Sequence, residues 1–389
     1  MLKNIIMSLL LCTFLSAESF DEFLQKAIKN SPYMESSALA VKQTKEQGNI
    51  LTRYENPTLE LEYASFEPDI GSNDNGYRIG YSQPIRLWGV SEDKKNLTDA
   101  NNKNADVNYA QKRAIFIRDI SLAYTSYSES NKLLNLSDES LSIAKKIYEI
   151  SIARLESGTI SQGIKLQAQV DYEMSENSKS TLSLAAMDSY YSLLKIAGIS
   201  KEIELENDYE FKINSNIENI ENPTINVLRS QQFQALSEAQ LNSNTVESID
   251  LFAEIENEPE QDILRVGVNL PLAIFNNKSQ EKTIAMLQAS RSELLIKNEN
   301  TRLNMDFQRL KKERKALLEL NINNERILKT QLKLLKMYED GYKISNINLL
   351  QLQDIKNKVI QTKRALIQIY TALNQNAIYT NFYQGTYNE

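Results

Sequence analysis

Two long stretches of the chain carry a heptad pattern of apolar residues and contain neither Gly nor Pro. They lie between Gly89 and Gly158 and between Pro271 and Gly341. At about 1.5 Å rise per residue, a helix filling either stretch is on the order of 100 Å long. Helices of that length are typical of coiled coils and similar extended assemblies. The repeated apolar positions are Ile120, Tyr127, Leu134, Leu141, Tyr148 and Leu155, and then Ile296, Leu303, Leu310 and Leu317.

Each long stretch ends at a Gly-containing break and is followed by a second helical stretch. The breaks are Glu156-Ser157-Gly158 and Glu339-Asp340-Gly341. The pattern therefore predicts two helical hairpins. Their long helices are expected at 90–157 and 277–340, and their return helices at 164–197 and 347–380.

Four shorter segments alternate apolar and polar residues with the period of two that is typical of β-strands. Leu59, Leu61 and Tyr63, for example, alternate with Glu60 and Glu62. Segments of about ten residues suit transmembrane β-strands, with apolar side chains toward lipid and polar side chains toward a lumen. The same alternation also fits a half-buried hairpin in a soluble domain. The expected strands are 57–66, 76–86, 249–257 and 262–272.

The two halves of the chain repeat one another. Residues 78–88 (RIGYSQPIRLW) match residues 265–275 (RVGVNLPLAIF), with Arg, Gly and Pro in common. We expect a first repeat at 18–197 and a second at 222–389, joined by a linker at 198–221. Each repeat comprises a helix, a strand pair, a long helix and a return helix. Because a barrel with an open edge cannot exist in lipid, four strands per chain must close with those of other copies, or they do not cross a membrane.

Composition narrows the chemistry that the chain can perform. Its 389 residues include no His and one Cys, and its formal net charge is −7. The lack of His removes most general-base, catalytic-triad and zinc-site chemistry. The acidic balance argues against a nucleic-acid partner. A hydrolase that works with a pair of carboxylates is disfavoured, because no two acidic residues lie beside glycines in a segment that would indicate a cleft. We expect no enzymatic activity, no cofactor and no metal site.

The N-terminus has the pattern of an export signal over residues 1–17. Lys3 supplies the positive end, an apolar run follows, and Ala17 is the small residue before the expected cleavage site. Cys12 is preceded by Leu11, whereas lipid attachment requires a small residue there. The mature chain then contains neither Cys nor His.

Four segments together resemble the TolC-like outer-membrane factors, the exit ducts of tripartite efflux and type I secretion systems. They are NPTLELEY (56–63), GYSQPIRLW (80–88), VNLPLAIFNN (268–277) and YEDGYKISNINLLQLQ (338–353). The first three are most similar to the cobalt–zinc–cadmium resistance (CzcC/CusC-like) branch. Two departures from that branch are a missing Gly-Gly-Lys-Arg near Gly89 and a missing Asn-Gln-Gly after Phe275.

The resemblance implies a mainly α fold with a small β part: two tandem helical-hairpin repeats, each with a β-hairpin. Three copies would build a twelve-stranded membrane β-barrel that continues into a periplasmic α-helical barrel, with residues 198–221 as an equatorial linker. It implies a homotrimer in the outer membrane of a Gram-negative bacterium, surrounded by outer-membrane lipid and extending into the periplasm.

The implied function is that of a passive exit channel for metal cations or drugs. Its partners would be a periplasmic adaptor (membrane fusion) protein and an inner-membrane pump, of the RND type or, in type I protein secretion, of the ABC type. A periplasmic coiled-coil adaptor or scaffold is a further alternative. Adaptors normally carry one helical hairpin, so the duplicated hairpins, each preceded by a strand pair, speak against it.

The resemblance places the gate and the adaptor-docking site at the two helix turns. The residues concerned are Gly158, Ser161, Ile164, Gly341, Ser345, Asn348 and Gln351. Some family members carry paired acids at this tip that form a ring for cations. The matching positions here are neutral, Asn348 and Gln351, with Ile164 at the first-repeat equivalent. Asp340 and Asp354 lie nearby and could substitute.

Two further sets of residues are expected at the membrane. Polar strand positions would face a mildly cation-favouring barrel lumen: Glu60, Glu62, Arg78, Asp250, Glu254 and Arg265. Trp88 and Phe275 follow equivalent strands and would form an aromatic belt at the periplasmic membrane face.

Overall fold

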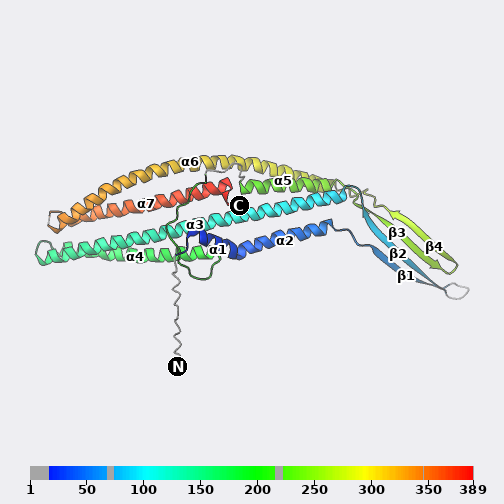
Figure 1. Ribbon diagram of the computed structural model, residues 1–389, viewed down its shortest axis with the longest axis horizontal. Coiled ribbons are helices and arrows are strands. Elements are labelled where there is room, and N and C mark those ends of the chain that lie inside the picture. The colour runs from blue at the N-terminus through cyan, green and yellow to red at the C-terminus, as the bar shows by residue number, and fades with distance from the viewer. Residues whose placement is uncertain (1–16, 68–73, 215–221, 345, 389) are drawn as a thin grey trace, which may run out of the picture. The chain divides into compact units, whose positions relative to one another are not determined.

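The computed structural model describes residues 17–67, 74–214, 222–344 and 346–388 (Figure 1). The export signal predicted for residues 1–17 therefore lies outside the described residues except for Ala17, and so does Ser345 of the predicted tip. The described part is mainly helical and contains a four-stranded antiparallel sheet. It confirms the predicted fold class, mainly α with a small β part.

Seven α-helices and one short 3₁₀ helix are present in the described ranges. They are α1 (Phe20–Asn30), α2 (Pro32–Thr52), α3 (Val90–Glu156), α4 (Gln162–Ala197), α5 (Pro223–Leu241), α6 (Ser279–Lys343), α7 (Leu349–Gln384) and η1 (Thr386–Asn388). None of them combines the length and the apolar character that a helix needs to cross a membrane. Of the heptad positions, Ile120, Leu303 and Leu310 are buried and the others are half-buried, so the repeat marks packing.

Two helices, α1 and α2, occupy the start of the first repeat, where the sequence pattern predicts a single helix. α1 ends at Asn30, Ser31 is extended, and Pro32 begins α2. A proline has no backbone N–H to donate and fits the first position of a helix, where that donor has no partner in any case. Pro223 begins α5 in the same way, with Asn222 as its N-cap.

The sheet has the order β1-β2-β3-β4 and is antiparallel throughout. Its strands are β1 (Thr58–Phe66), β2 (Asp74–Arg86), β3 (Ser248–Glu258) and β4 (Gln261–Asn269). Leu61, Ile79, Ile255 and Leu264 are register partners and form one row across the sheet. The strand predicted to reach residue 272 ends at Asn269, because Pro271 cannot donate to a strand ladder.

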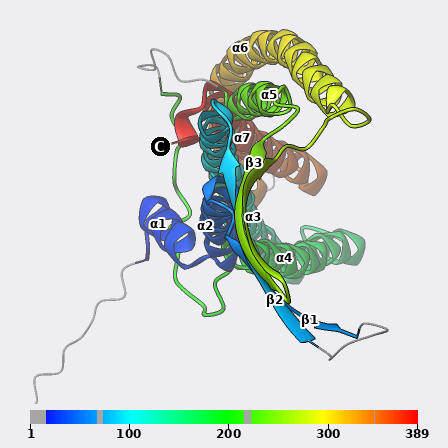
Figure 2. The ribbon, with the colours of Figure 1, turned by 90° about the vertical axis from the view of Figure 1, so that its right-hand side faces the viewer.

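The chain divides into two compact units, and each unit draws on both sequence repeats. The first unit comprises Met1–Glu35, Arg113–Ile220 and Asn304–Glu389. The second comprises Ser36–Lys112 and Glu221–Leu303, and contains the sheet seen in Figure 2. The long helices α3 and α6 each contribute to both units. Both helix turns belong to the first unit.

Candidate gate and docking site at the helix turns

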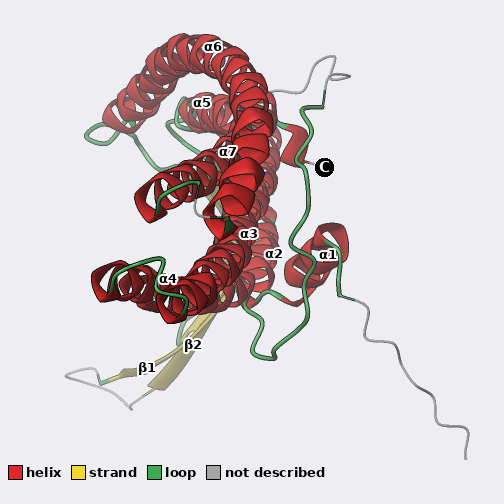
Figure 3. Cartoon of the chain, turned by 90° about the vertical axis from the view of Figure 1, so that its left-hand side faces the viewer, coloured by secondary structure: helices red, strands yellow, loops and turns green. Residues whose placement is uncertain are grey.

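Four helices of the first unit contribute side chains to one apolar core next to the two turns. Figure 3 shows α3, α4, α6 and α7 from the side on which the turns lie. The core is made by residues of α3, α4, α6 and α7, so it joins the two helical hairpins. Its buried members are Ile147, Ala168, Leu335, Tyr342, Leu349, Leu352, Ile355 and Val359. Both turns are therefore supported by one core to which the helices of both hairpins contribute.

The first turn, between α3 and α4, depends on the backbone conformation of Gly158. Its φ of +72° lies in the left-handed region that favours glycine. The N–H groups of Gly158 and Thr159 donate to the carbonyls of Leu155 and Arg154, both at 2.9 Å, and so satisfy the end of α3. A Cβ on Gly158 would meet no atom within 4 Å. The residue is thus required for its conformation and not for a close contact.

Ser161 and Ile164 begin the return helix of the first hairpin. Ser161 is the N-cap of α4, and its Oγ accepts a hydrogen bond of 3.4 Å from the Ile164 N–H. The Ile164 side chain is half-buried and packs against the shared core. Ile164 thereby has a packing role at this turn.

The second turn, between α6 and α7, is built differently. The break predicted at Gly341 is wrong in detail, because α6 continues through it to Lys343. Gly341 is helical, and a Cβ there would lie 2.6 Å from Cγ1 of Ile347. Its carbonyl accepts a hydrogen bond of 2.9 Å from the Asn346 N–H. Glycine is needed here so that the returning chain can approach the helix closely.

Asn348 and Gln351 form a capping box at the start of α7. The Gln351 N–H donates to Asn348 Oδ1 at 2.9 Å, and the Asn348 N–H donates to Gln351 Oε1 at 3.2 Å. This reciprocal pair satisfies backbone donors that the first turn of a helix leaves free. Both side chains therefore cap the start of α7, where the turn ends.

The neighbouring acids have lysine partners on their own helices. Asp340 lies 3.5 Å from Lys343, and Asp354 lies 2.6 Å from Lys358. Across the described ranges, no group of three or more acidic side chains is arranged to hold a metal ion.

Tyr342 joins the two hairpins and was not among the predicted site residues. Its side chain is 1% exposed, and its hydroxyl lies 2.8 Å from Ser151 Oγ. The Arg154 guanidinium donates to the Tyr342 carbonyl at 3.0 Å and lies 4.5 Å from the centre of the ring. These contacts tie the end of α3 to the end of α6. They depend on tertiary packing, which a pattern within either hairpin does not show.

Two ion pairs also link the helices of the two hairpins. Lys146 of α3 lies 2.9 Å from Glu339 of α6. Lys356 of α7, with 2% of its side chain exposed, lies 2.6 Å from Asp171 of α4. A buried lysine requires such a partner, since burial of an unpaired charge is costly.

The predicted lumen residues share one face of the sheet in the second unit. Register partners in an antiparallel sheet point to the same side, and Glu62, Arg78 and Glu256 form one such row. A neighbouring row consists of Glu60, Gly80, Glu254 and Arg265. Asp250 lies on the same face four residues before Glu254.

Arginines bridge the acids of this face. Arg78 pairs with Glu62 and, at 4.0 Å, with Glu254, while Arg265 pairs with both Glu254 and Glu256. Glu256 was missed among the predicted site residues, although it continues the same alternation along the chain. Acids outnumber arginines here, so the face is acidic.

The opposite face of the sheet is apolar and exposed. Leu61 of β1 is 71% exposed, and Val266 of β4 is 76% exposed. Trp88 and Phe275, which follow β2 and β4, are fully exposed. Side chains of this kind are normally buried, so an apolar surface of this extent points to an apolar environment or a partner.

The described part of the linker is an extended segment, which we call the strap (residues 202–214). Its acids stand at every second position and are exposed: Glu202, Glu204, Glu206, Asp208 and Glu210. Leu205 and Phe211 alternate with them and are buried. This period of two is visible in the sequence of the predicted linker.

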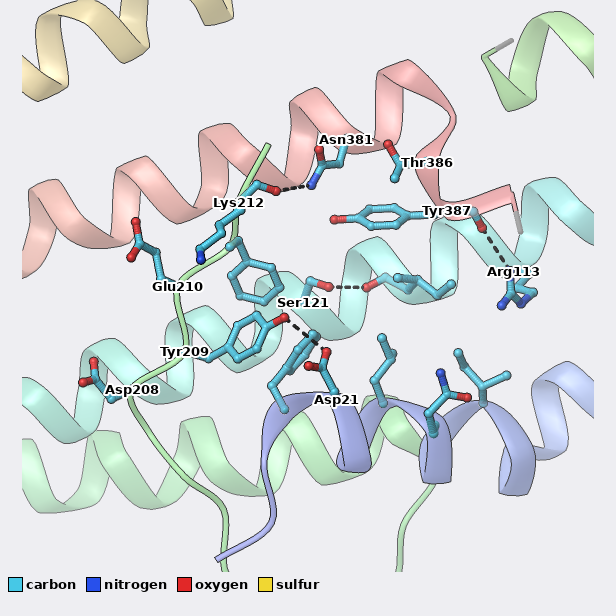
Figure 4. A pocket seen from close by; sticks show the side chains of 16 residues that line it. Asp21, Arg113, Ser121, Asp208, Tyr209, Glu210, Lys212, Asn381, Thr386 and Tyr387 are labelled. Carbon is cyan, nitrogen blue, oxygen red and sulfur yellow. Dashed lines mark hydrogen bonds between the residues drawn. The ribbon is translucent and has the colours of Figure 1, made fainter. Parts of the chain in front are cut away.

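Side chains from the helices hold the strap by its backbone. The Ile203 N–H donates to the hydroxyl of Tyr190, and the Phe211 N–H donates to Asn374 Oδ1 at 3.1 Å. Figure 4 shows Asn381 bonded to the strap carbonyl of Lys212 at 2.8 Å, beside a cavity of about 610 Å³.

Three acids and two bases line this cavity: Asp21, Asp208, Glu210, Arg113 and Lys212. The Tyr209 hydroxyl donates to Asp21 at 3.1 Å (Figure 4). Burial, and then the nearby Asp21 carboxylate, raise the pKa of Tyr209 to about 12. The tyrosine therefore remains a neutral donor at physiological pH.

Comparison with known proteins supports the resemblance found in the sequence. The model of the family "Outer membrane efflux protein" matches residues 23–199. A sequence search of curated proteins finds no match.

Among solved structures, the chain is similar to the CmeC outer membrane channel of Campylobacter jejuni, with a TM-score of 0.76 and 16% identity over 94% of this chain and 85% of that one. It is similar to CusC, with a TM-score of 0.78 and 14% identity over 96% and 93% of the two chains. It is also similar to VceC, an outer membrane protein of Vibrio cholerae, with a TM-score of 0.75 and 12% identity over 94% and 95%.

The predicted resemblance to the TolC-like outer-membrane factors is confirmed, in sequence over the first repeat and in fold over nearly the whole chain. CusC, which represents the branch that the motifs favour, is among these structures. Its TM-score is close to those of CmeC and VceC, so the fold does not separate the branches.

Proposed function

We propose that three copies of this chain form a passive efflux channel in the outer membrane of a Gram-negative bacterium. The observation that carries the proposal is the sheet, which has an exposed apolar face and two open edges. Within the described residues, β1 pairs only with β2, and β4 only with β3. An apolar face suits lipid, but an open edge in lipid leaves backbone groups without hydrogen bonds. Joining β1 of one copy to β4 of the next removes both edges.

A closed ring of three copies has twelve strands, because each copy supplies four. Two copies would already reach the roughly eight strands of the smallest membrane barrels, so the choice of three copies rests on the resemblance to the TolC-like factors. The apolar face then contacts lipid, and the acidic face lines the lumen. Trp88 and Phe275 lie just beyond the strands, as an aromatic belt at the membrane surface requires.

The acidic face suits the passage of cations. Arg78 and Arg265 are each bridged by acids, and Glu60 and Asp250 add further negative charge to the same face. Rings of such side chains in a trimer attract cations without binding them tightly. The cargo is accordingly metal cations or cationic drugs, delivered by an RND-type pump through a periplasmic adaptor.

The long helices form the periplasmic tunnel, and the helix turns form its gate. Arg154, Ser151 and Tyr342 hold the two hairpins of one chain together at their turns. Opening requires these contacts to break, so the gate is an element with two packed states that the adaptor biases.

A cysteine scan tests the closed ring. The only cysteine, Cys12, lies in the predicted export signal, so introduced cysteines form disulfides without interference from native ones. One cysteine in β4 is combined in turn with single cysteines along β1. Oxidation in membranes is expected to yield covalent dimers and trimers at one register. Monomers at every register would contradict the proposal.

Adaptor docking is tested at exposed apolar residues of the second turn. Ile344 and Leu350 are 68% and 62% exposed. Leu350→Glu places an acid in the first turn of α7, where the helix dipole tolerates it, so folding is preserved. The change is expected to abolish efflux and adaptor cross-linking while the oligomer stays intact. Lys358→Glu, further along α7, is the control.

Substitution of Gly158 or Gly341 is a poorer test of docking, since each change strains its own turn. Normal efflux with Leu350→Glu and Ile344→Glu would show that the adaptor docks elsewhere.

A further inference from the structure

The cavity shown in Figure 4 lies within the first unit and is lined by α1, α3, the strap and the C-terminal end of α7. Its volume of about 610 Å³ lies in the range of roughly 300–1,000 Å³ that holds small-molecule ligands. Polar side chains come from all four elements, and α1 and α3 also contribute Leu24, Ile28 and Ile117. Leu24 and Ile28 are only half-buried. The cavity therefore combines an apolar wall with charged groups.

Arg113 of α3 is a cation with donors to spare. Its Nη1 donates to the Tyr387 carbonyl at 3.2 Å, and no carboxylate of the described ranges pairs with it. The residue is half-buried, yet its Nε and Nη2 keep accessible surface. A guanidinium carries five N–H donors. The edge formed by Nε and Nη2 fits the two oxygens of a carboxylate.

Asp21 of α1 is an acid with an acceptor to spare. Its Oδ1 accepts a hydrogen bond of 3.1 Å from the Tyr209 hydroxyl, and its Oδ2 has no donor among the described residues. No lysine or arginine in the described part of the chain pairs with it. The side chain is exposed, so a ligand can reach it. An ammonium group would supply the missing donor and the missing positive charge.

The other charges that line the cavity compensate one another. Asp208 lies 2.9 Å from Lys132. Glu210 and Lys212 are two residues apart on the extended strap, so their side chains lie on the same side of it. The acid of α1 and the base of α3 are therefore the two charges without a compensating partner. Figure 4 shows them apart from one another.

The spacing of these two charges suits a short extended chain. The ring of Phe20, the residue before Asp21, lies 4.8 Å from the ring of Tyr124 on α3. Tyr124 follows Arg113 by eleven residues. That interval is about 16 Å along a helix. An extended peptide covers roughly 3.3–3.6 Å per residue, so about three to five residues join the two ends.

The strap offers open backbone groups along the cavity. The Tyr209 carbonyl and the Phe211 N–H bond to the side chain of Asn374 on α7. Successive residues of an extended chain face opposite sides, so the N–H and C=O of Glu210 point away from α7. Neither group has a hydrogen-bond partner among the described residues. An extended peptide pairs with such an edge through its own backbone.

We propose that this cavity binds a short peptide with a free amino group and a free carboxylate. The ammonium group donates to Asp21 Oδ2, and the carboxylate accepts from Nε and Nη2 of Arg113. Peptide groups between the two ends pair with the backbone of Glu210, and apolar side chains lie against Leu24 and Ile28.

Peptide binding is measured by calorimetry on the full-length protein in detergent solution. The probes are tri-, tetra- and penta-alanine, followed by the N-acetylated and C-amidated forms of the peptide that binds best. Removal of either terminal charge is expected to weaken binding roughly tenfold, as one charge-assisted hydrogen bond implies. A further probe, ω-aminododecanoate, has the length of a tetrapeptide but no peptide groups. It is expected to bind more weakly than tetra-alanine.

Two variants separate the two ends of the peptide. Arg113→Gln is expected to abolish the preference for the free carboxylate over the amide and to leave the preference for the free amine. Asp21→Asn keeps an acceptor for the Tyr209 hydroxyl and is expected to do the reverse. Lys29→Gln, on α1 but outside the cavity, is the matched control and leaves both preferences unchanged. Should Arg113→Gln fail to fold, the Asp21→Asn result alone decides for or against the site.

Three results would overturn the proposal. Equal affinity for the free, acetylated and amidated peptides would show that the terminal charges are not bound. Binding of ω-aminododecanoate as tight as that of tetra-alanine would contradict a peptide as the ligand. Binding that appears only after removal of Glu389 would show that the end of the chain competes for the same cavity.

Discussion

The turn between α3 and α4 and the turn between α6 and α7 share the sequence Glu-x-Gly but use their glycines differently. Gly158 lies beyond the end of its helix with a φ of +72°, and the space around it is open. Gly341 is still helical, and Ile347 leaves no room for a Cβ. The residue after each glycine differs as well, since Thr159 is exposed whereas Tyr342 is buried.

Duplicated sequence therefore does not mean duplicated structure at these two turns. The glycine of the first turn is required for its backbone conformation, whereas the glycine of the second turn allows the close approach of Ile347. Tyr342, the residue after that second glycine, packs into the shared core and against α3. The second turn is therefore the one whose movement disturbs the contacts between hairpins. For this reason we propose Tyr342 and its partners as the contact that holds the gate closed.

The largest expected effect is the loss of the Tyr342 side chain. Tyr342→Ala leaves a cavity in the shared core and is expected to lower the free energy of unfolding by about 3–5 kcal/mol. Thr159→Ala, at the equivalent exposed position, removes an exposed hydrogen bond to the Arg154 carbonyl and is expected to lower it by only about 0.5–1 kcal/mol. Denaturant unfolding of the detergent-solubilised protein measures both. Similar losses for the two variants would contradict the asymmetry.

The two glycines are distinguished by a double-mutant cycle with Ile347→Ala. Gly341→Ala overpacks its site at a cost of about 1–3 kcal/mol, partly offset by about 1 kcal/mol of helix propensity. Truncation of Ile347 removes the clash, so the pair is expected to couple. Gly158→Ala costs about 1–2 kcal/mol through its left-handed backbone and is expected to show no coupling to Ile347. Coupling at Gly158 would show that the first turn is also a close contact.

The two N-caps are expected to differ by a smaller amount. Asn348→Ala removes a reciprocal capping box and is expected to cost about 1 kcal/mol. Ser161→Ala removes one long hydrogen bond and is expected to cost about 0.5 kcal/mol. Hydrogen exchange in the first turns of α7 and α4 reports each change locally. A greater loss of protection in α4 would reverse the ranking.

The smallest effect is expected from the ion pair near the second turn. Lys146 and Glu339 are 2.9 Å apart, but Lys146 is half exposed. Lys146→Ala is expected to cost less than about 1 kcal/mol, and the difference should shrink in high salt. A large and salt-insensitive loss would mean that charge, and not packing, holds the second turn.

Much of the fold could be predicted from the sequence because its signals are local. Heptad spacing and the absence of Gly and Pro mark the long helices, and strict alternation marks the strands. The prediction at Gly341 failed because glycine signals a turn and a close approach equally well, and only the position of Ile347 distinguishes them. The contact between Arg154 and Tyr342 joins residues far apart in the chain, so no periodicity reveals it.

Single-channel conductance of the purified protein in planar bilayers tests the central claim most directly, after a heat-modifiable oligomer has been verified on a gel. We expect discrete openings that prefer cations and that become longer when Tyr342→Ala loosens the second turn. A protein that neither inserts into the bilayer nor conducts would contradict the channel and favour a periplasmic scaffold.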